Sequence, residues 1–299
     1  MSAGWRITLA SLDRLPQGAL SRALGWLADR PVPPSLRPLV LGTFVRLTGI
    51  RMEEAARPME SFGSVNELFV RRLAEGSRSW PSDPRILASP VDGVIGLCGR
   101  IREGTLVQAK GIEYSADALL GEPGAGRRFE GGLFITIYLS PRHYHRIHAP
   151  LPGRVVRAHH LPGRLMPVNQ AAVHSVDRLF ATNERLVAEM ETAVGRTVVV
   201  AVGATNVGRI SAAFDPEWAD GEGRSVTNRR SPVVPVRDYP GGVPVETGAE
   251  IMAFHLGSTV VLLTEPGLEP SPQLLPGHEI RMGTPLARPS NDPNNRKVE

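Results

Sequence analysis

Two stretches near the start of the chain carry apolar residues at the period of an α-helix. In residues 19–28 these positions fall at i, i+3, i+4 and i+7, namely Leu20, Ala23, Leu24 and Leu27. In residues 35–47, which Ser35 can cap, one apolar face consists of Leu36, Leu39, Val40, Phe44 and Leu47. Prolines break the chain between the two stretches, at Pro31, Pro33 and Pro34. The pattern therefore predicts two amphipathic helices.

Further along, the pattern changes from helix to strand. A helix is predicted over residues 64–75, because Ser64 and Glu67 form a capping box. Beyond Trp80, short β-branched runs alternate with Gly and Pro and predict strands. These runs are Gly93–Leu97, Leu133–Leu139, Arg154–Val156, Thr197–Val202 and Thr259–Leu263. One later helix is predicted over residues 183–194, with Asn183 as its cap.

Two segments lack periodicity. Residues 212–248 are rich in Gly, Pro, Asp and Arg and are predicted to be a loop, and the polar tail from Pro289 onwards is expected to fray. Taken together, the elements predict an α+β fold, with a mostly antiparallel, β-rich core and N-terminal amphipathic helices. We place the boundary between a helical segment, residues 1–80, and a β-rich domain, residues 81–299.

Composition narrows the class of protein. A chain of 299 residues with 41% hydrophobic and 21% charged residues can bury a sizeable core and is not disordered. The single cysteine, Cys98, excludes an intramolecular disulfide and is expected to be a small buried apolar residue. No run approaches the ~18 apolar residues of a spanning helix, and no secretory signal is evident. We therefore expect a cytoplasmic protein, either soluble or peripheral to a membrane.

Positive charge is concentrated at the N-terminus. The whole chain carries a net charge of +4, and residues 1–50 contain six arginines against two aspartates. Such a segment favours an anionic partner. The apolar helix faces could pack on the rest of the protein, or Trp5 and Trp26 could sit with the arginines at a lipid surface. Nucleic acid ranks lower, because no recognisable nucleic-acid motif follows.

The tetrapeptide Leu256-Gly257-Ser258-Thr259 leads into an apolar strand. A serine hydroxyl can attack the carbonyl of the preceding residue, provided that a base takes its proton and donors stabilise the oxyanion. Glycine before the serine removes a Cβ that would hinder the attack. On composition alone, however, the same residues are a glycine at the entrance of a strand.

A cluster of histidines could supply that base. His143, His145 and His148 fall within six positions, in a chain with eight histidines. Their spacing fits neither a zinc-finger nor a zincin pattern, so we predict no metal site. Asp92, in Ser-Pro-Val-Asp-Gly at 89–93, is either a turn residue or an acid that orients a histidine.

In combination, these segments resemble the phosphatidylserine decarboxylase family, over about residues 18–265. The resemblance rests on Leu-Gly-Ser-Thr, on Ser-Pro-Val-Asp-Gly, and on Tyr-Leu-Ser-Pro-Arg at 138–142 followed by Tyr-His-Arg-Ile-His at 144–148. Shorter matches are Leu20-Ser21-Arg22 with Gly25-Trp26, Asn66-Glu67 with Phe69-Val70-Arg71, Asn183-Glu184-Arg185, and Val202-Gly203-Ala204-Thr205 with Val207-Gly208. Several separated motifs in one order are far more specific than any single motif.

The resemblance implies a role for each matching residue. The chain would cut itself between Gly257 and Ser258, giving a beta chain of residues 1–257 and an alpha chain of residues 258–299. Ser258 would become a covalent pyruvoyl group, the cofactor, which decarboxylates phosphatidylserine to phosphatidylethanolamine through a Schiff base. Asp92 and His148 match the acid and base that activate the serine, and His145 matches a histidine tied to decarboxylation. His143 has no matching role and is expected to face solvent.

The same resemblance implies partners and a location. The substrate would be phosphatidylserine in an anionic membrane surface, reached from the cytoplasmic face by a peripheral enzyme. The two chains would stay together as a heterodimer that can itself dimerise, and no nucleic acid is expected. Two alternatives remain open: a pyruvoyl enzyme for a soluble amino acid, and a lipid-surface binding protein without catalysis.

Overall fold

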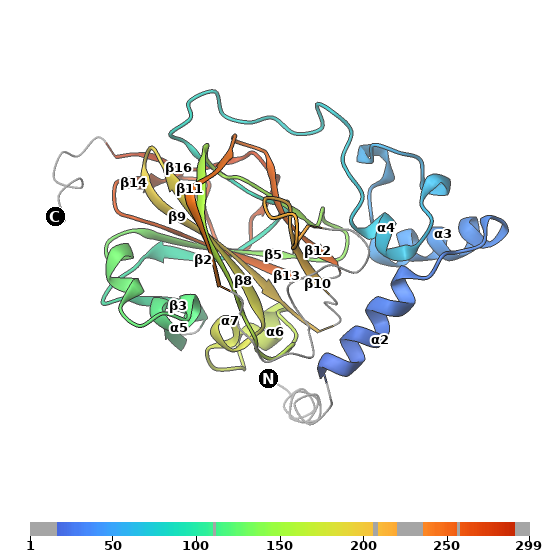
Figure 1. The fold of residues 1–299 in the computed structure, drawn as a ribbon, viewed down its shortest axis with the longest axis horizontal. Coiled ribbons are helices and arrows are strands. Elements are labelled where there is room, and N and C mark those ends of the chain that lie inside the picture. Colours follow the sequence, from blue (N-terminus) through green and yellow to red (C-terminus); the bar gives the residue numbers. More distant parts are fainter. Residues whose placement is uncertain (1–16, 110–111, 206–208, 220–235, 256–257, 291–299) are drawn as a thin grey trace.

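The computed structural model describes residues 17–109, 112–205, 209–219, 236–255 and 258–290 (Figure 1). Its α-helices are α2 (Gln17–Asp29), α3 (Arg37–Thr48), α4 (Val65–Phe69), α5 (Ala116–Leu120), α6 (Gln170–Val173) and α7 (Leu179–Thr182). Short 3-10 turns cover Pro34–Leu36, Met52–Glu54, Met59–Ser61 and Ala125–Phe129. Within the described part of the chain, none of the helices is long and apolar enough to cross a membrane.

An antiparallel sheet of eight strands forms the body of the protein. Its spatial order is β11-β7-β8-β9-β13-β5-β2-β15. The strands, in that order, are Val236–Val245, Gly153–Leu161, Arg185–Thr192, Gly195–Gly203, Ser258–Thr264, Leu133–Leu139, Gly93–Arg100 and Glu279–Ile280. The predicted α+β class, with an antiparallel β-rich core and N-terminal helices, is confirmed.

Smaller sheets and helices pack around this sheet. One three-stranded sheet joins β10 (Arg209–Ala212), β12 (Glu250–His255) and β6 (Arg146–His148), and another joins β1 (Leu87–Ala88), β16 (Pro285–Pro289) and β14 (Leu268–Pro270). The hairpin of β3 (Thr105–Ala109) and β4 (Ile112–Ser115) lies with α5, α6 and α7 in the lower part of Figure 1, whereas β14 and β16 lie in the upper part. Because both faces are covered, central strands such as β9 and β13 carry continuous apolar runs rather than an alternation of apolar and polar residues.

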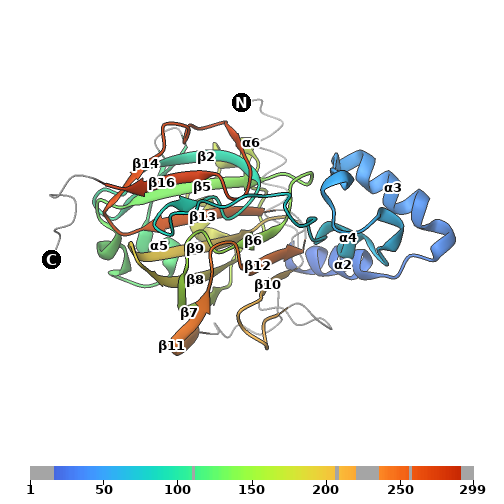
Figure 2. The same cartoon turned by 90° about the horizontal axis from the view of Figure 1, so that it is seen from above.

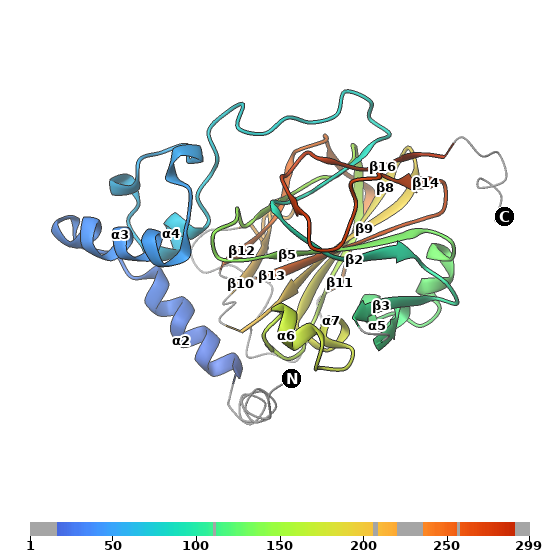
Figure 3. The ribbon, with the colours of Figure 1, turned by 180° about the vertical axis from the view of Figure 1, so that it is seen from behind.

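The N-terminal helices form a separate lobe beside the sheet (Figures 2 and 3). Their own small core contains Leu41, Ile50, Phe62 and Leu68. Polar contacts tie the lobe to the body: Asp29 of α2 pairs with Arg209 of β10 at 2.8 Å, and Asn66 of α4 contacts the His255 ring of β12 at 3.1 Å. The lobe is therefore bonded to the strand that leads towards Ser258.

Several predicted elements are confirmed. The predicted helices over 19–28 and 35–47 correspond to α2 and α3, and the predicted strand Leu133–Leu139 coincides with β5. Ser64 caps α4 by accepting a hydrogen bond from the Glu67 backbone N–H at 3.1 Å. Ser35, by contrast, is not the cap of α3, because it lies inside the 3-10 turn that precedes the helix and Leu36 holds the cap position without a side-chain bond.

Two predicted helices are wrong in type or length. Residues 185–192 form strand β8 instead of a helix, because β7 and β9 pair along both of its edges and bury its apolar residues on both faces. Asn183 instead bonds the carbonyls of Met166 and Gly203. Helix α4 ends at Phe69 rather than near 75, because the chain then bonds back to the segment around Glu54 and Ala56.

The predicted loop over 212–248 is wrong in part. Its second half is strand β11, which pairs with β7 across an irregular register that accommodates Pro240, Gly241 and Gly242. Its first half includes a fully buried Trp218, and residues 220–235 lie outside the described residues. The chain remains ordered past Pro289, since Ser290 is buried, and the rest of the predicted tail is not described. Cys98 is half-buried in β2.

Candidate active site

Three segments predicted to carry the site meet at one end of the eight-stranded sheet. Strand β13 begins at Ser258, whose backbone is in register with Leu139, the last residue of β5, and with Gly203, the last residue of β9. Strand β2 begins one residue after Asp92. Because neighbouring antiparallel strands run in opposite directions, the starts of β2 and β13 flank the end of β5. Gly257 lies outside the described residues, and Ser258 is located here by its backbone.

Glycine after Asp92 allows β2 to approach β5 closely. A Cβ on Gly93 would lie 2.6 Å from Cγ2 of Ile137 and 2.7 Å from the carbonyl oxygen of Tyr138, which is closer than real Cβ atoms approach. The Asp-Gly pair is therefore required by strand packing as well as by the turn. This packing fixes Asp92 beside the end of β5.

The loop that follows β5 is organised by Ser140. Its carbonyl accepts from the His143 backbone N–H at 3.0 Å and lies 3.1 Å from Nε2 of His145, while its own N–H donates to Nδ1 of His143 at 2.9 Å. The expectation that His143 faces solvent is wrong, because its side chain is 6% exposed and its Nε2 lies 3.6 Å from the Glu279 carboxylate. Ser140 therefore contacts both His143 and His145, whose side chains are buried.

His145 is completely buried, and its ring stacks on Phe69 of α4 with centroids 4.1 Å apart. Burial, aided by the positive charge of Arg71, lowers its pKa to about 3. The imidazole is therefore neutral at neutral pH. Because the Ser140 carbonyl can only accept, Nε2 carries the proton and Nδ1 keeps its lone pair. Nδ1 is buried with no hydrogen-bond partner among the described residues.

His148, at the end of β6, has a defined tautomer as well. Its Nδ1 donates to the carbonyl of Gly248 at 2.7 Å, which leaves Nε2 to accept from the Tyr144 hydroxyl at 3.1 Å. Gly248 has a φ of +82°, and a Cβ there would lie 2.5 Å from the Trp80 ring, so only glycine can present this carbonyl. Burial lowers the pKa of His148, which keeps the imidazole neutral and able to act as a base.

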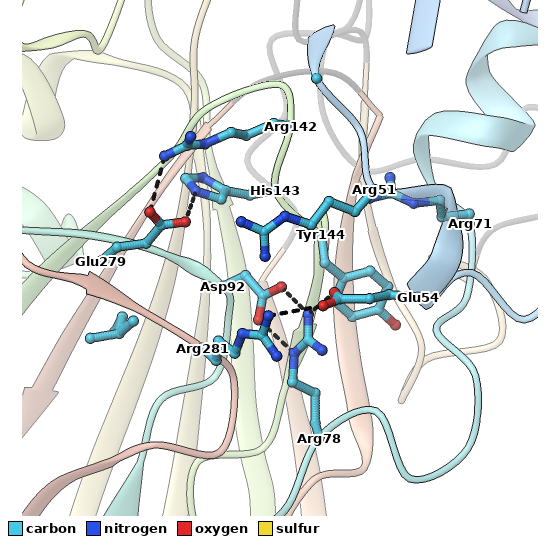
Figure 4. Close-up of a pocket in the computed structure, with 12 residues that line it drawn as sticks. Arg51, Glu54, Arg71, Arg78, Asp92, Arg142, His143, Tyr144, Glu279 and Arg281 are labelled. Atoms are coloured by element: carbon cyan, nitrogen blue, oxygen red, sulfur yellow. Dashed lines mark hydrogen bonds and ion pairs between the residues drawn. The ribbon is translucent and has the colours of Figure 1, made fainter. Parts of the chain in front are cut away.

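Asp92 is held by a cation rather than by a histidine (Figure 4). Arg78 forms a forked pair with both carboxylate oxygens, at 2.9 and 2.5 Å, and the Met282 backbone N–H donates to Asp92 at 2.8 Å. Arg78 also pairs with Glu54 at 2.7 Å. Asp92 and His148, both described, share no hydrogen bond, so their pairing stays a prediction. The backbone N–H of His148 does bond to the carbonyl of Pro90 at 2.9 Å, which ties the two segments together.

The arrangement supplies two neutral imidazoles, on His145 and His148, with tautomers fixed by backbone carbonyls. Each keeps an unprotonated nitrogen, which suits proton transfer at neutral pH. Metal binding lacks a comparable basis: no group of three or more His, Cys, Asp or Glu side chains suited to a metal ion occurs in the described ranges.

A family model for phosphatidylserine decarboxylase matches residues 65–288, which include all of these segments. The chain belongs to the phosphatidylserine decarboxylase family. It is 44% identical to a phosphatidylserine decarboxylase proenzyme of Anaeromyxobacter sp. (strain K), over 94% of this chain and 98% of that protein. Proenzymes of Myxococcus xanthus and Stenotrophomonas maltophilia are 41% and 38% identical, covering 84% and 96% of this chain and 87% and 99% of theirs.

Sequence reasoning missed several residues of this decarboxylase-family site. Tyr144 and Arg71 lie inside motifs that carried the family resemblance. Their positions were therefore noticed, but no chemical role was predicted for either side chain. Glu54 and Arg78 gave no signal, because neither spacing nor composition distinguishes them from surface charges. Their side chains are nevertheless 23% and 5% exposed, and they enclose Asp92.

Replacing Arg78 with glutamine is expected to destabilise the fold strongly. Two carboxylates, those of Asp92 and Glu54, would lose their shared cation at a largely buried position, and breaking such a pair typically costs about 3–5 kcal/mol. Chemical denaturation measures the change in the free energy of unfolding. The matched control is Arg85→Gln, whose pairing with Asp83 is exposed and is expected to leave stability unchanged. Equal denaturation midpoints for the two variants would contradict the expectation.

Proposed function

We propose that this chain is a phosphatidylserine decarboxylase proenzyme that cuts itself between Gly257 and Ser258. One observation carries the proposal beyond family membership: the register of β5, β9 and β13 puts Ser258 directly beside the loop that holds the buried histidines. A soluble amino-acid decarboxylase and a non-catalytic lipid-binding protein are the alternatives that an experiment must exclude.

Self-cleavage starts at the Ser258 hydroxyl. His148 takes the hydroxyl proton on Nε2 as the serine oxygen attacks the Gly257 carbonyl, moving the acyl group from nitrogen to oxygen. Loss of the ester by elimination releases the Gly257 carboxylate and leaves dehydroalanine at 258, and water then converts this to the pyruvoyl group with release of ammonia. His148 suits the first step because the Gly248 carbonyl holds its other nitrogen protonated.

A pyruvoyl group formed from Ser258 would lie beside the loop after β5 that holds His143 and His145. The pyruvoyl carbonyl supplies a sink for the electrons that remain when CO2 leaves. His145 holds an unprotonated Nδ1 in a fully buried position, so it can accept a proton from a substrate amine and return it to carbon. Stacking on Phe69 fixes the plane of the His145 ring, and the direction in which Nδ1 points is fixed with it.

The apolar faces of the N-terminal helices favour a peripheral position on a membrane. On α3, most of the predicted apolar face is exposed: Leu39 and Leu47 are 67% and 81% exposed, whereas Phe44 packs against the core of the lobe. On α2, Trp26 is 59% exposed and lies under the Arg30 guanidinium. Apolar and aromatic side chains beside cations suit an anionic lipid surface. We propose that residues 1–80 dock on the cytoplasmic face of the cell membrane.

Replacing Leu39 and Leu47 together with glutamate is expected to weaken binding to phosphatidylserine vesicles by more than about tenfold, because each buried leucine contributes about 1.5–3 kcal/mol. Vesicle cosedimentation measures the binding. The matched control is Leu275→Glu, which changes a 49% exposed leucine outside the lobe and is expected to leave binding intact. Self-cleavage should continue in both proteins. Undiminished vesicle binding by the double variant would remove α3 from the membrane contact.

The proposed activity is tested by intact mass and by CO2 release on the same preparation. We expect two chains, residues 1–257 and 258–299, with the second blocked to Edman sequencing because it starts with a ketone. CO2 should be released from phosphatidylserine vesicles and not from free amino acids. Release from amino acids alone would favour the soluble-substrate enzyme. A single uncut chain that binds vesicles would favour the lipid-binding protein, and a free serine at residue 258 would indicate simple proteolysis.

A further inference from the structure

Arg71 is a buried cation that forms no ion pair with the described carboxylates. Arg71 is 3% exposed, its Nε has no hydrogen-bond partner among the described residues, and its Nη1 donates to the Phe69 carbonyl at 3.5 Å. The two carboxylates that attract it, on Asp92 and Glu54, are already bonded to Arg78. Burying an uncompensated charge is costly, so this position favours a bound anion.

Another buried arginine shows the contrast. Arg185 also lacks a carboxylate partner among the described residues, but each of its three side-chain nitrogens donates to a carbonyl, those of Leu119, Asn183 and Ala118, at 2.7 to 2.8 Å. Arg185 is thereby satisfied within the protein. Arg71 keeps free donors, so the two arginines differ in what they can still bind.

Arg71 lines a cavity that contains several other arginines. Arg71 forms part of the wall of a cavity of about 480 Å³, together with Arg57, Arg72 and Arg146 and with Glu67 as the one acid that lines it. Cavities of this size hold small ligands. A second, much smaller space lies on the other side of Arg71, next to Asp92 and Tyr144, and Figure 4 shows the Arg71 side chain at its margin.

The cavity adjoins residues that contact both the candidate site and the core of the helical lobe. The His145 ring stacks on Phe69, which lies two residues before Arg71 in the chain. Asn66, on the cavity wall, contacts His255, three residues before Ser258. Phe62, also on the wall, packs in the same small core as Leu41 of α3. The cavity therefore adjoins both the strand that precedes Ser258 and the core of the helical lobe.

We propose that this cavity binds the phosphodiester of the substrate headgroup, with Arg71 as its main charge partner. The inference rests on the proposed decarboxylase function. The planar guanidinium fork matches two phosphate oxygens. The other anion of the headgroup is its carboxylate, which leaves as CO2. An arginine paired with the carboxylate would stabilise the bound substrate more than the transition state, and the barrier to decarboxylation would rise. The phosphodiester keeps its charge throughout, so binding it anchors the headgroup in every state.

The first test uses the unaltered protein. Glycerophosphoethanolamine carries the amine and the phosphodiester, ethanolamine carries the amine alone, and serine carries the amine and a carboxylate. We expect glycerophosphoethanolamine to inhibit CO2 release from phosphatidylserine at about 10- to 100-fold lower concentration than ethanolamine, the range of charge-assisted hydrogen bonds. Equal inhibition by the two would overturn the inference while leaving the decarboxylase function standing. Absence of CO2 release would instead count against the function itself.

The second test uses Arg71→Gln and Arg71→Lys, with the exposed Arg85→Gln as the control. The phosphodiester is bound equally in the substrate complex and in the transition state, so its loss should change KM and not kcat. We therefore expect KM to rise about 10- to 100-fold in Arg71→Gln with kcat little changed, and to rise less in Arg71→Lys. In Arg71→Gln, the ratio between the ethanolamine and glycerophosphoethanolamine concentrations that give equal inhibition should fall towards one. If Arg71→Gln instead weakens inhibition by serine alone, Arg71 holds the carboxylate and the proposal is wrong. If the variants do not fold, the inhibitor comparison on the unaltered protein decides.

Discussion

A protein in which Ser258 is replaced by alanine is expected to remain a single chain of 299 residues and to release no CO2 from phosphatidylserine. In the proposed mechanism the side-chain oxygen attacks Gly257 and then leaves with the Gly257 carboxylate, so its removal abolishes the cut and, with it, the pyruvoyl group that turnover needs. A denaturing gel and a CO2-release assay on one preparation measure the two losses. Strand β13 pairs through its backbone with β5 and β9, so the variant should still fold.

The neighbouring residue provides the control for this substitution. Thr259 is buried, and its Oγ1 has no hydrogen-bond partner among the described residues, so Thr259→Val changes shape little and removes no described bond. We expect it to cut itself and to turn over lipid. Cutting at the same position in Ser258→Ala would mean that another protease makes the cut.

His148→Ala and His145→Ala are expected to separate the two reactions. His148 presents an unprotonated Nε2 and should be needed for self-cleavage, so His148→Ala should accumulate uncut. His145→Ala should still mature to some degree but lose about 10²–10⁴-fold in lipid turnover, the usual contribution of a general acid-base. The same gel and CO2 assay measure both. His278→Ala, at an exposed histidine, should behave as the unaltered protein.

Two outcomes would change this assignment of roles. If His145→Ala stays uncut while His148→Ala matures and loses only turnover, the two roles are reversed. If both variants stay uncut, the histidines act as one unit in maturation. For His145→Ala the second outcome is a structural question as well, because removing this ring also removes its contact with the Ser140 carbonyl and can alter the loop after β5.

The sequence predicted elements best where local pattern and tertiary context agree. The run Leu133–Leu139 is β-branched, apolar and bounded by turn residues, and it forms β5 with the predicted limits. Residues 185–192 contain Leu, Ala, Glu and Met, which favour a helix locally, but pairing with two neighbouring strands overrides that preference. Strand β11 was hidden by its prolines and glycines, which an edge strand tolerates.

Candidate site residues could be named from the sequence where they carry recognisable chemistry, and their roles stay predictions. Asp92, His145, His148 and Ser258 were named from the sequence, and the register brings their segments to one end of the sheet. The partners of those residues were not predictable. Nothing along the chain indicates that Arg78 would bond Asp92 or that Phe69 would stack on His145, because such contacts join residues that are far apart in the sequence.

The position of β13 has a consequence for the protein after cutting. Its first residue would become a chain end inside the sheet, with β5 and β9 hydrogen-bonded on either side, and the same small chain also supplies β14, β15 and β16. Dilution alone could not release a fragment held in this way, so the two pieces would unfold together as one cooperative unit. A large chain made without its small partner would expose two open apolar strand edges, which is the surface from which aggregation begins.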